Sequence, residues 1–197
     1  MHIAARPLRN AWVSLEPMAE KHRTDLRAAC DADPRTFNEL YPYSMAGEHF
    51  ESGWTNLRGE AAAGRMIQYA VVVQGRCVGM TSFIGPDATN RLVEIGATYY
   101  APDRRGGPVN PAAKRLLLAE AFEAGANRVW LKVDAINARS RAAVLKLGAR
   151  QEGILRQDRI TWTGRVRDTV VFSILAAEWS AVRDRLDARL AAMTAAP

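Results

Sequence analysis

Three strand-like segments in immediate succession, between residues 66 and 100, constrain the fold of this chain more than any other feature. They are Met66–Val73, Cys77–Ile84 and Leu92–Tyr100, and they are rich in β-branched and aromatic residues, which favour strands. The turns between them are short and contain Gly75 and Gly85-Pro86. Because short turns join strands that are neighbours in a sheet, the segment is predicted to form an antiparallel meander.

Strands and helices alternate after the meander. One helix is predicted to begin at Asn110-Pro111, because Asn can cap free backbone N–H groups and proline at the first helical position has no N–H to lose. The predicted elements are a helix from Asn110 to Ala124, a strand over Val129–Val133, a helix from Asn137 to Leu147, an extended segment over Ala149–Leu155, a strand over Asp168–Leu175 and a helix from about Glu178 to Met193. This alternation indicates an α/β protein with a mixed sheet.

The residues before the meander are predicted to be mainly helical. Ala11–Leu15 alternates like a short strand, and a helix is predicted over Pro17–Cys30. A loop is predicted over Pro34–Met45 and a second helix over Glu48–Ala63. Because the chain shows no repeat and no linker, a single domain is predicted over residues 1–197, with the fold proper at about 11–176 and a C-terminal helix and tail at 177–197.

The composition excludes several classes of protein. With 48% hydrophobic and 24% charged residues, the chain is neither disordered nor collagen-like. No apolar run approaches the roughly 18 residues that cross a bilayer, and the N-terminus lacks the apolar region of a secretion signal, so a cytoplasmic location is expected. Cys30 and Cys77 are too few for a disulfide framework and are expected to be buried thiols. Because His2, His22 and His49 lack the spacing of metal ligands, no metal is expected.

The net charge of +6 suggests a polyanion as partner, but the basic residues are dispersed. Arginines recur along the whole chain with acidic residues between them, which is typical of a solvated surface. A basic nucleic-acid-binding protein therefore stays a weaker alternative. The local exception is Asp103-Arg104-Arg105-Gly106-Gly107, where two arginines adjoin two glycines.

This arginine- and glycine-containing loop lies between a predicted strand and a predicted helix. Backbone N–H groups at a helix start bind anions, glycines allow a phosphate to approach the backbone, and arginines donate to phosphate oxygens. A ligand with a pyrophosphate fits these features, and a surface turn with solvated arginines is the alternative. Neither the phosphate loop of the NTPases nor the Gly-x-Gly-x-x-Gly dinucleotide fingerprint is present, which leaves coenzyme A as the phosphate ligand to consider.

Motifs throughout the chain resemble those of the GCN5-related N-acetyltransferases (GNAT). The resemblance rests on the order of elements and on Arg104-Arg105-Gly106-Gly107-Pro108-Val109, Asn137-Ala138-Arg139-Ser140 and Leu147-Gly148-Ala149. Further segments resemble the branch that includes the ribosomal-protein N-terminal acetyltransferases of the RimJ and RimL kind: Val109-Asn110 through Leu116-Leu117-Leu118, Lys132-Val133-Asp134, Glu152-Gly153 and Arg165-Val166-Arg167-Asp168. The resemblance implies a single-domain α/β fold (α+β in some schemes) with a mixed central sheet of about seven strands flanked by helices.

The resemblance also implies acetyl-CoA as cosubstrate and assigns residues to it. In the family the fourth strand bulges, and its backbone amides hold the pantetheine arm and polarise the thioester carbonyl. Asn137 would help to hold the pantetheine or the thioester, and Ser140 lies beside it on the same helix. The residues implied in cosubstrate binding are Ala97, Thr98 and Tyr99 on the bulge, Arg104, Arg105, Gly106, Gly107, Val109 and Asn110 at the phosphates, and Asn137 and Ser140.

Two positions depart from the family pattern. Val109 occupies the final small-residue position of the pyrophosphate loop, and Val144 stands where many members carry a tyrosine that protonates the leaving thiolate. Ser140 is the nearest hydroxyl and is the candidate proton donor, with capping of backbone donors as its alternative role. Glu94 is the candidate general base, with a structural hydrogen bond as its alternative.

We also expect particular roles for three further groups of residues. Asp134 is expected to cap or orient the following helix in preference to acting as a base. Tyr41-Pro42-Tyr43 would line the acceptor opening or form a surface turn. The tryptophans Trp12, Trp130 and Trp162 are expected in the core or in the wall of a groove.

The resulting prediction is an N-acetyltransferase that moves the acetyl group of acetyl-CoA directly to a primary amine, with Ser140, Glu94 and Asn137 as candidate catalytic residues. Neither cysteine lies in the candidate site, which argues against a covalent enzyme intermediate. A protein N-terminus is the favoured acceptor, and polyamines, amino acids and aminated antibiotics stay open. The alternative from another functional class is a regulatory module that binds CoA but catalyses no transfer. The resemblance to the family also implies a homodimer.

Overall fold

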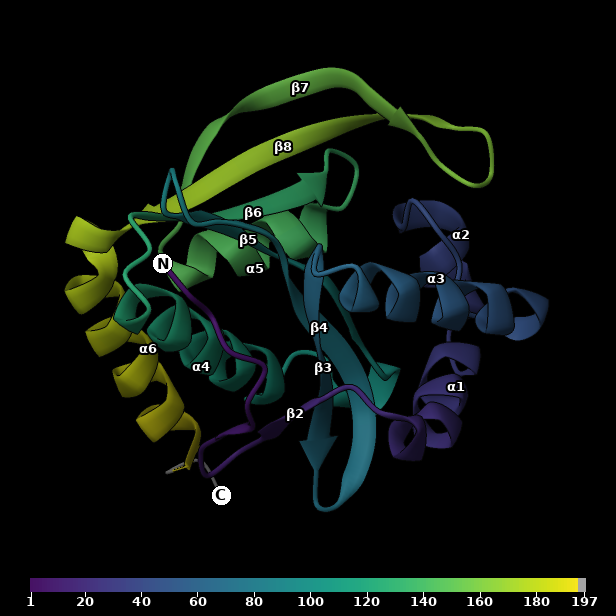
Figure 1. The fold of residues 1–197 in the computed structure, drawn as a ribbon, viewed down its shortest axis with the longest axis horizontal. Coiled ribbons are helices and arrows are strands. Elements are labelled where there is room, and N and C mark those ends of the chain that lie inside the picture. Colours follow the sequence, from purple (N-terminus) through teal and green to yellow (C-terminus); the bar gives the residue numbers. More distant parts are fainter. Residues whose placement is uncertain (195–197) are drawn as a thin grey trace.

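A mixed β-sheet of eight strands runs through the computed structural model, which describes residues 1–194 (Figure 1). The strand order is β1-β2-β3-β4-β5-β6-β8-β7, and every neighbouring pair is antiparallel except β5 and β6. The strands are β1 (Leu8–Arg9), β2 (Ser14–Pro17), β3 (Met66–Val73), β4 (Arg76–Asp87), β5 (Leu92–Tyr100), β6 (Arg128–Asp134), β7 (Arg150–Ile160) and β8 (Val166–Leu175). The sheet thus has one strand more than the predicted seven.

Helices cover both faces of the sheet (Figure 1). One face is covered by α4 (Val109–Glu123), α5 (Ala138–Leu147) and α6 (Trp179–Thr194), and the other by α1 (Arg23–Asp31), α2 (Pro34–Leu40) and α3 (Phe50–Ala62). Each face has its own hydrophobic core, with Leu117 and Phe172 in the first and Phe37 and Met80 in the second. The predicted α/β class, meander and strand-helix alternation are confirmed, and residues 195–197 of the predicted tail lie outside the described residues.

The predicted loop over Pro34–Met45 is wrong, because its first part forms helix α2. Asp33 caps this helix by accepting the backbone N–H of Thr36 at 3.3 Å, and Pro34 takes the first helical position. These are ordinary helix-start signals. The helix has only 7 residues, too few for an apolar period to be read from the sequence.

The first predicted strand and helix are both displaced along the chain. The side-chain oxygen of Asn10 accepts the backbone N–H groups of Trp12 and Val13, so a turn occupies the start of the predicted strand. Pro17 does not open a helix, because it still pairs with Tyr69 of β3. Helix α1 begins only at Arg23, after a short 3-10 turn.

Two features of β5 create the space for a site. Strand β5 pairs with β6 only over three residues, Leu92 to Glu94, and the two strands have no further pairing beyond that point. Strand β5 also bulges: two steps along β4, from Met80 to Ser82, match three along β5, from Tyr99 to Gly96. Ala97 within the bulge has a positive φ of 46°. The bulge expected from the family resemblance is therefore present.

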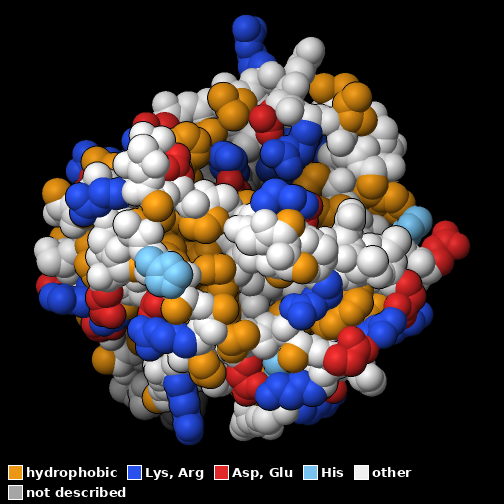
Figure 2. Space-filling model, in the orientation of Figure 1, with side chains coloured by type: hydrophobic (Ala, Val, Ile, Leu, Met, Phe, Trp, Pro, Cys, Tyr) orange, Lys and Arg blue, Asp and Glu red, His pale blue; other side chains and the backbone are white. Residues whose placement is uncertain are grey.

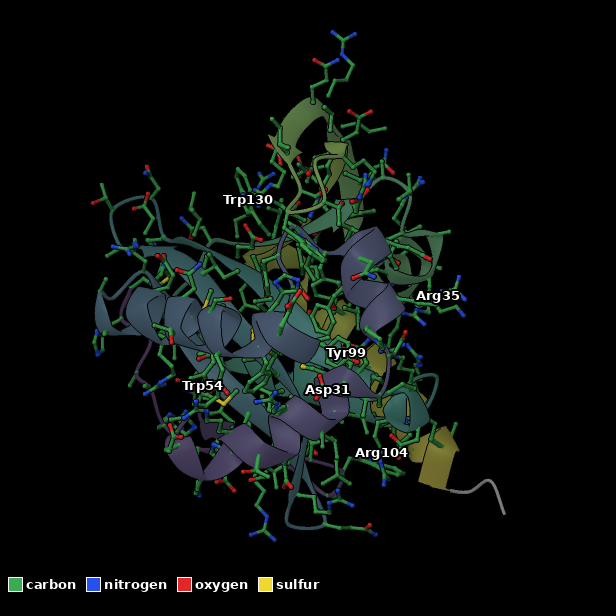
Figure 3. The ribbon with its side chains drawn as sticks, turned by 90° about the vertical axis from the view of Figure 1, so that its right-hand side faces the viewer. Asp31, Arg35, Trp54, Tyr99, Arg104 and Trp130 are labelled. Atoms are coloured by element: carbon green, nitrogen blue, oxygen red, sulfur yellow. The ribbon has the colours of Figure 1, made fainter. Side chains whose placement is uncertain are left out.

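Tyr99 fastens the bulged strand to the helices on the α1–α3 face (Figure 3). Its ring stacks on Phe37 of α2 with centroids 4.6 Å apart, and its hydroxyl donates to the carbonyl of Ala29 in α1 at 2.9 Å. The side chain is fully buried. These contacts make Tyr99 a link between the sheet and both α1 and α2.

The two cysteines are free and buried, as predicted. Burial raises the pKa of the Cys77 thiol to about 11 and that of Cys30 further still. Both thiols are therefore uncharged near neutral pH. Within residues 1–194, no helix combines the length and the apolar character needed to cross a membrane.

Replacement of Gly79 by alanine is expected to destabilise the protein. Gly79 lies on β4 opposite Tyr100 of β5, and a Cβ there would meet the backbone oxygen of Tyr99 at 2.1 Å. Because backbone atoms must shift, we expect the free energy of unfolding to fall by about 1–3 kcal/mol in a urea titration.

The matched control for this prediction is Gly59→Ala. Gly59 lies in α3, and a Cβ added there would have nothing within 4 Å, so alanine should raise the free energy of unfolding by about 0.5–1 kcal/mol through helix propensity. Equal stability of the two variants would contradict the close approach at Gly79.

Candidate active site

A pocket of about 710 Å³ occupies the gap that opens between β5 and β6. It is lined from one side by residues of α4 and α5 and from the other by residues of α2, α3 and the segment after α2. The predicted site residues that line it are Glu94, Ala97, Thr98, Tyr99, Arg105, Gly106, Asn110, Asn137 and Ser140. Arg104, Gly107 and Val109 were also predicted, and they are not among the lining residues.

The start of α4 gives the pocket an end that suits an anion. The helix begins at Val109 with Pro108 as its N-cap, so the prediction that Asn110 caps the helix is wrong. In the described part of the chain no side chain caps this helix, and its first turn contains no acidic residue. The first backbone N–H groups are thus left for a ligand, and the helix dipole favours negative charge there. Gly106, with φ of +82°, shapes the preceding loop.

The two loop arginines have different surroundings. Arg104 pairs with Asp103 and its side chain is 39% exposed, on the outside of the loop (Figure 3). Arg105 turns inward, where Nε donates to the carbonyl of Tyr100 at 2.8 Å and Nη1 donates to Asp33 at 2.5 Å. Its Nη2 is buried and has no hydrogen-bond partner among residues 1–194. Arg105 therefore ties the loop to the start of α2, and one nitrogen remains for a ligand.

Val109, which departs from the family motif, directs its side chain into the core. Its side chain is 6% exposed and packs in the hydrophobic core beneath α4. The larger side chain is therefore accommodated away from the loop.

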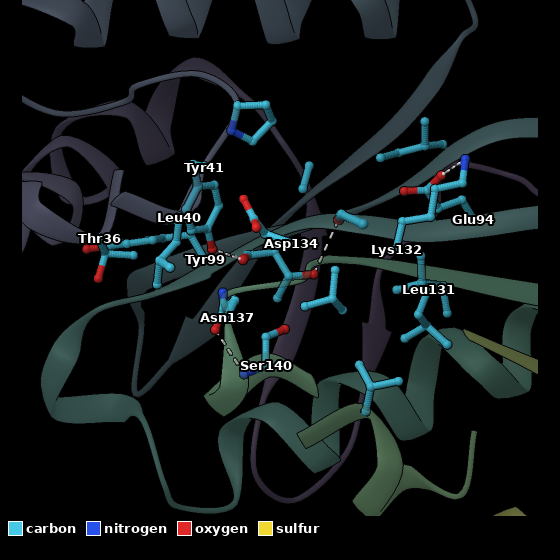
Figure 4. A pocket seen from close by; sticks show the side chains of 18 of the residues that line it. Thr36, Leu40, Tyr41, Glu94, Tyr99, Leu131, Lys132, Asp134, Asn137 and Ser140 are labelled. Atoms are coloured by element: carbon cyan, nitrogen blue, oxygen red, sulfur yellow. Dashed lines mark hydrogen bonds and ion pairs between the residues drawn. The ribbon is translucent and has the colours of Figure 1, made fainter. Parts of the chain in front are cut away.

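Hydrogen bonds from three directions hold the bulge of β5. The hydroxyl of Tyr41 donates to the carbonyl of Thr98 (Figure 4). The hydroxyl of Thr98 lies 3.2 Å from the carbonyl of Gly96 and 2.8 Å from the hydroxyl of Thr81. A non-glycine residue with positive φ, such as Ala97, persists only where its surroundings fix it, and these contacts do so.

Asn137 and Ser140 meet at the start of α5. Asn137 caps this helix as predicted, because its side-chain oxygen accepts the backbone N–H of Ser140 at 3.0 Å (Figure 4). The Ser140 hydroxyl has no hydrogen-bond partner within the described chain and lines the pocket. Val144 lines the pocket one turn further on. Ser140 is thus the hydroxyl that α5 offers to this part of the pocket.

Glu94 forms an ion pair at the point where the strands diverge. Its carboxylate lies 2.8 Å from the Lys132 ammonium of β6 (Figure 4). The Lys132 ammonium also lies 5.2 Å from the ring centre of Trp130. The ion pair agrees with a structural role for Glu94, which was the alternative to a role as general base. The Glu94 side chain is 19% exposed and lines the pocket.

Asp134 orients the connection between β6 and α5. Its side chain is only 1% exposed, and one oxygen accepts the backbone N–H of Ile136 at 3.2 Å. The other oxygen accepts from Arg165 at 2.5 Å, and Arg167 lies 3.7 Å away. Burial lowers the pKa of Arg167, and Asp134 opposes that shift. The contacts agree with the expected orienting role of Asp134.

The half of the pocket on the α1–α3 face of the sheet lies under the β7–β8 turn. Tyr41, Pro42 and Tyr43 line it, as expected, and burial raises the pKa of both tyrosines. Trp162 from the turn reaches over and donates its indole N–H to the carbonyl of Phe37 at 3.1 Å. Figure 2 shows Lys and Arg side chains around the hollow beneath this hairpin, with acidic side chains among them.

Comparisons with known proteins agree with this geometry. The family model described as "Acetyltransferase (GNAT) domain" matches residues 13–150. The chain is 34% identical, over 114 residues, to YdaF of Bacillus subtilis (strain 168), which is named as a candidate ribosomal N-acetyltransferase. That alignment covers 57% of this chain and 61% of YdaF.

Two solved structures extend the similarity over almost the whole chain. An acetyltransferase candidate from T. thermophilus shares 34% identity with a TM-score of 0.87, covering 96% of this chain and 100% of that one. RimJ of Mycobacterium smegmatis, solved with CoA-disulfide, shares 27% identity with a TM-score of 0.81, covering 96% and 97%. This chain belongs to the GNAT acetyltransferases. The names of YdaF and RimJ support the branch suggested by the sequence motifs.

This GNAT chain places a lysine of α4 in the pocket wall to which the sequence analysis assigned no role. Lys114 of α4 is 5% exposed and lines the pocket, and burial lowers the pKa of its ammonium from 10.5 to about 7. It lies on the same helix face as Leu117, Leu118 and Ala121, all of them buried. A lysine within an apolar stripe at helical spacing was therefore a signal that the sequence contained.

The described part of this GNAT chain contains no group of three or more His, Cys, Asp or Glu side chains that could hold a metal ion.

Burial of Lys114 predicts a pH dependence of stability. The unfolded chain holds this proton up to about pH 10.5, whereas the folded chain releases it near pH 7. Between these values the unfolded state binds more protons, so the contribution of Lys114 to the free energy of unfolding should rise with pH by up to about 1.4 kcal/mol per unit. Urea titrations from pH 6 to pH 10 would show this slope as a difference between the parent and Lys114→Met.

Lys146→Met is the matched control, because Lys146 is an exposed lysine on α5. The free energies of unfolding of Lys146→Met and the parent should differ by the same amount at every pH in this range. The same flat difference for Lys114→Met would contradict the burial of Lys114.

Proposed function

We propose that the protein transfers the acetyl group of acetyl-CoA directly to a primary amine, with a protein N-terminus as the favoured acceptor. The observation that carries this proposal is the pocket through the gap between β5 and β6. It extends from the uncapped start of α4 on one face of the sheet to the tyrosine-lined half on the other. A cosubstrate and an amine can therefore approach one point from opposite faces.

Acetyl-CoA fits the α4 half of the pocket. The free N–H groups at the start of α4, Gly106 and the unpartnered Nη2 of Arg105 would bind its phosphates. Beyond Glu94, the last residue of β5 that pairs with β6, backbone groups on the β6 side of β5 would bond the amides of the pantetheine arm. Asn137 and Ser140 would border the thioester.

The reaction needs an uncharged amine, a donor to the developing oxyanion and a proton for the leaving thiolate. Attack by the amine nitrogen forms the C–N bond, and collapse of the intermediate breaks the C–S bond. Backbone N–H groups of the bulge, around Thr98, would stabilise the oxyanion. The free hydroxyl of Ser140 would donate a proton to the thiolate, and the amine would lose its proton to water or to Glu94.

A protein N-terminus is supported as acceptor by the similarity to YdaF and by the shape of the acceptor half. That half opens between α2–α3 and the β7–β8 hairpin, where an extended chain end can enter. Lys132, Arg159 and Arg167 line it together with Glu94 and Asp134, so polar contacts are available along an entering peptide. A homodimer and a cytoplasmic location stay predictions.

An acceptor screen tests the proposal directly. With acetyl-CoA present, the parent should release free thiol when offered peptides with free N-termini, and much less with the same peptides blocked at the N-terminus. Calorimetry should show acetyl-CoA binding without an acceptor. Tight binding with no thiol release from peptides, polyamines or amino acids would instead favour the regulatory module.

Ser140→Ala should lower kcat in the same assay by about 10- to 100-fold and change KM less, since a proton donor acts in the transition state. Ser180→Ala, at an exposed serine in α6, serves as the control and should keep parent kinetics. Parent kinetics in Ser140→Ala would return that serine to a purely structural role.

Gly106→Ala should weaken acetyl-CoA binding. The positive φ of Gly106 costs an alanine about 1–2 kcal/mol, so the loop should rearrange and Kd should rise by about 5- to 30-fold in calorimetry. Gly75→Ala imposes the same backbone penalty at φ of +78°, in the β3–β4 turn away from the pocket. It should leave Kd unchanged, and an equal Kd in both variants would remove Gly106 from the phosphate site.

A further inference from the structure

The pocket wall contains a buried amine, that of Lys114, which has no role in the reaction proposed above. Lys114 lies in the second turn of α4, and its Nζ lies 2.7 Å from the hydroxyl of Thr98 and 3.3 Å from that of Thr81. The first hydroxyl belongs to the β5 bulge and the second to β4. The lysine thus connects the helix that follows the phosphate loop with the strand that receives the thioester.

Stability does not explain a lysine at this position. The Lys114 ammonium has three N–H donors, but the described chain provides two hydroxyl oxygens as acceptors and no carboxylate within ion-pair distance. Burying an ammonium without a counter-ion is costly, which agrees with the lowered pKa of this group. An apolar side chain of similar length would be expected to stabilise the fold as well as lysine or better.

The contact with Thr98 is the one that could affect the reaction. Thr98 follows Ala97, the residue with positive φ, and its hydroxyl also bonds within the bulge to Gly96. Its carbonyl is held separately by Tyr41 on the acceptor face. Lys114 therefore fixes the side chain of Thr98 from the cosubstrate face while Tyr41 fixes its backbone from the other.

We propose that Lys114 is a positioning residue: by holding the Thr98 hydroxyl, it fixes the β5 bulge in the conformation that presents backbone N–H groups to the thioester. This inference rests on the proposed function. Lys114 acts through Thr98 and does not itself contact the reacting atoms. The hydroxyls of Thr81 and Thr98 are the groups that face its amine from the packed strands, and the described chain brings no charged group against it.

A double-mutant cycle tests whether Lys114 acts through Thr98. The variants are Lys114→Met, which keeps the length of the side chain, Thr98→Val, which keeps its branched shape, and the combination. Each single variant should lower kcat by about 10- to 100-fold, the usual cost of a small displacement in a site, and change KM for acetyl-CoA by less than about threefold. The kcat of the double variant should be no lower than that of the more impaired single variant, because both substitutions remove the same contact between Lys114 and Thr98.

Two further measurements separate positioning from folding. The free energy of unfolding of Lys114→Met should equal or exceed that of the parent at pH 7. Hydrogen exchange of the peptide that covers Gly96–Tyr100 should become faster in Lys114→Met, and stay at the parent rate in the control Lys146→Met. If Lys114→Met does not fold, Lys114→Gln, which is uncharged and polar, is measured in the same way.

The outcomes distinguish the inference from the proposed function. If the decreases in kcat of the two single variants multiply in the double variant, Lys114 acts independently of Thr98, and the inference is overturned. Parent activity in Lys114→Met would do the same. If the parent itself releases no thiol with any acceptor, the proposed function fails, and hydrogen exchange alone decides the inference: an unchanged exchange rate over Gly96–Tyr100 in Lys114→Met overturns it, and a faster rate supports it.

Discussion

The divergence of β5 from β6 is the constraint on which the site depends. The two strands are the parallel pair in an otherwise antiparallel sheet, and they pair over three residues before they separate. Backbone N–H and C=O groups that lose a strand partner must find another, and a ligand can provide it. The pocket, the bulge and the free start of α4 all adjoin this gap, so the fold places backbone donors and a helix N-terminus around the same space.

Much of this fold was predictable from the sequence because its strongest signals are local. The bounds predicted for β3 and β5 agree with the structure, since each strand is a continuous run of strand-forming residues between turn residues. The same local logic located the loop before α4 and the Asn137 cap of α5. Helix α2 was missed because seven residues are too short to show a helical period. The predicted cap at Asn110 was wrong, because the helix begins at Val109 and its N-cap is Pro108.

Side-chain directions in the site could not be predicted, because they depend on partners distant in sequence. Arg105 points inward because Asp33, 72 residues away, accepts its guanidinium. Two lysines on the pocket wall show the same dependence: Lys132 has the carboxylate of Glu94 beside it, whereas Lys114 meets only hydroxyls. The apolar stripe around Lys114 signals its burial, but only the tertiary arrangement shows which lysine has a carboxylate beside it. The overall charge of +6 carried no information about either.

The contact between the β7–β8 turn and α2 has a consequence for how such a protein can diversify. The indole of Trp162 and the guanidinium of Arg165 both bond to α2 carbonyls, those of Phe37 and Glu39. The rim over the tyrosine-lined half of the pocket is therefore assembled from the β7–β8 turn and the C-terminal part of α2, whereas the start of α2 holds Arg105 of the loop before α4. Changes in the length or sequence of these two segments can reshape what enters the pocket while the cosubstrate half stays as it is. A scaffold built in this way can acquire new acceptors by exchanging its rim.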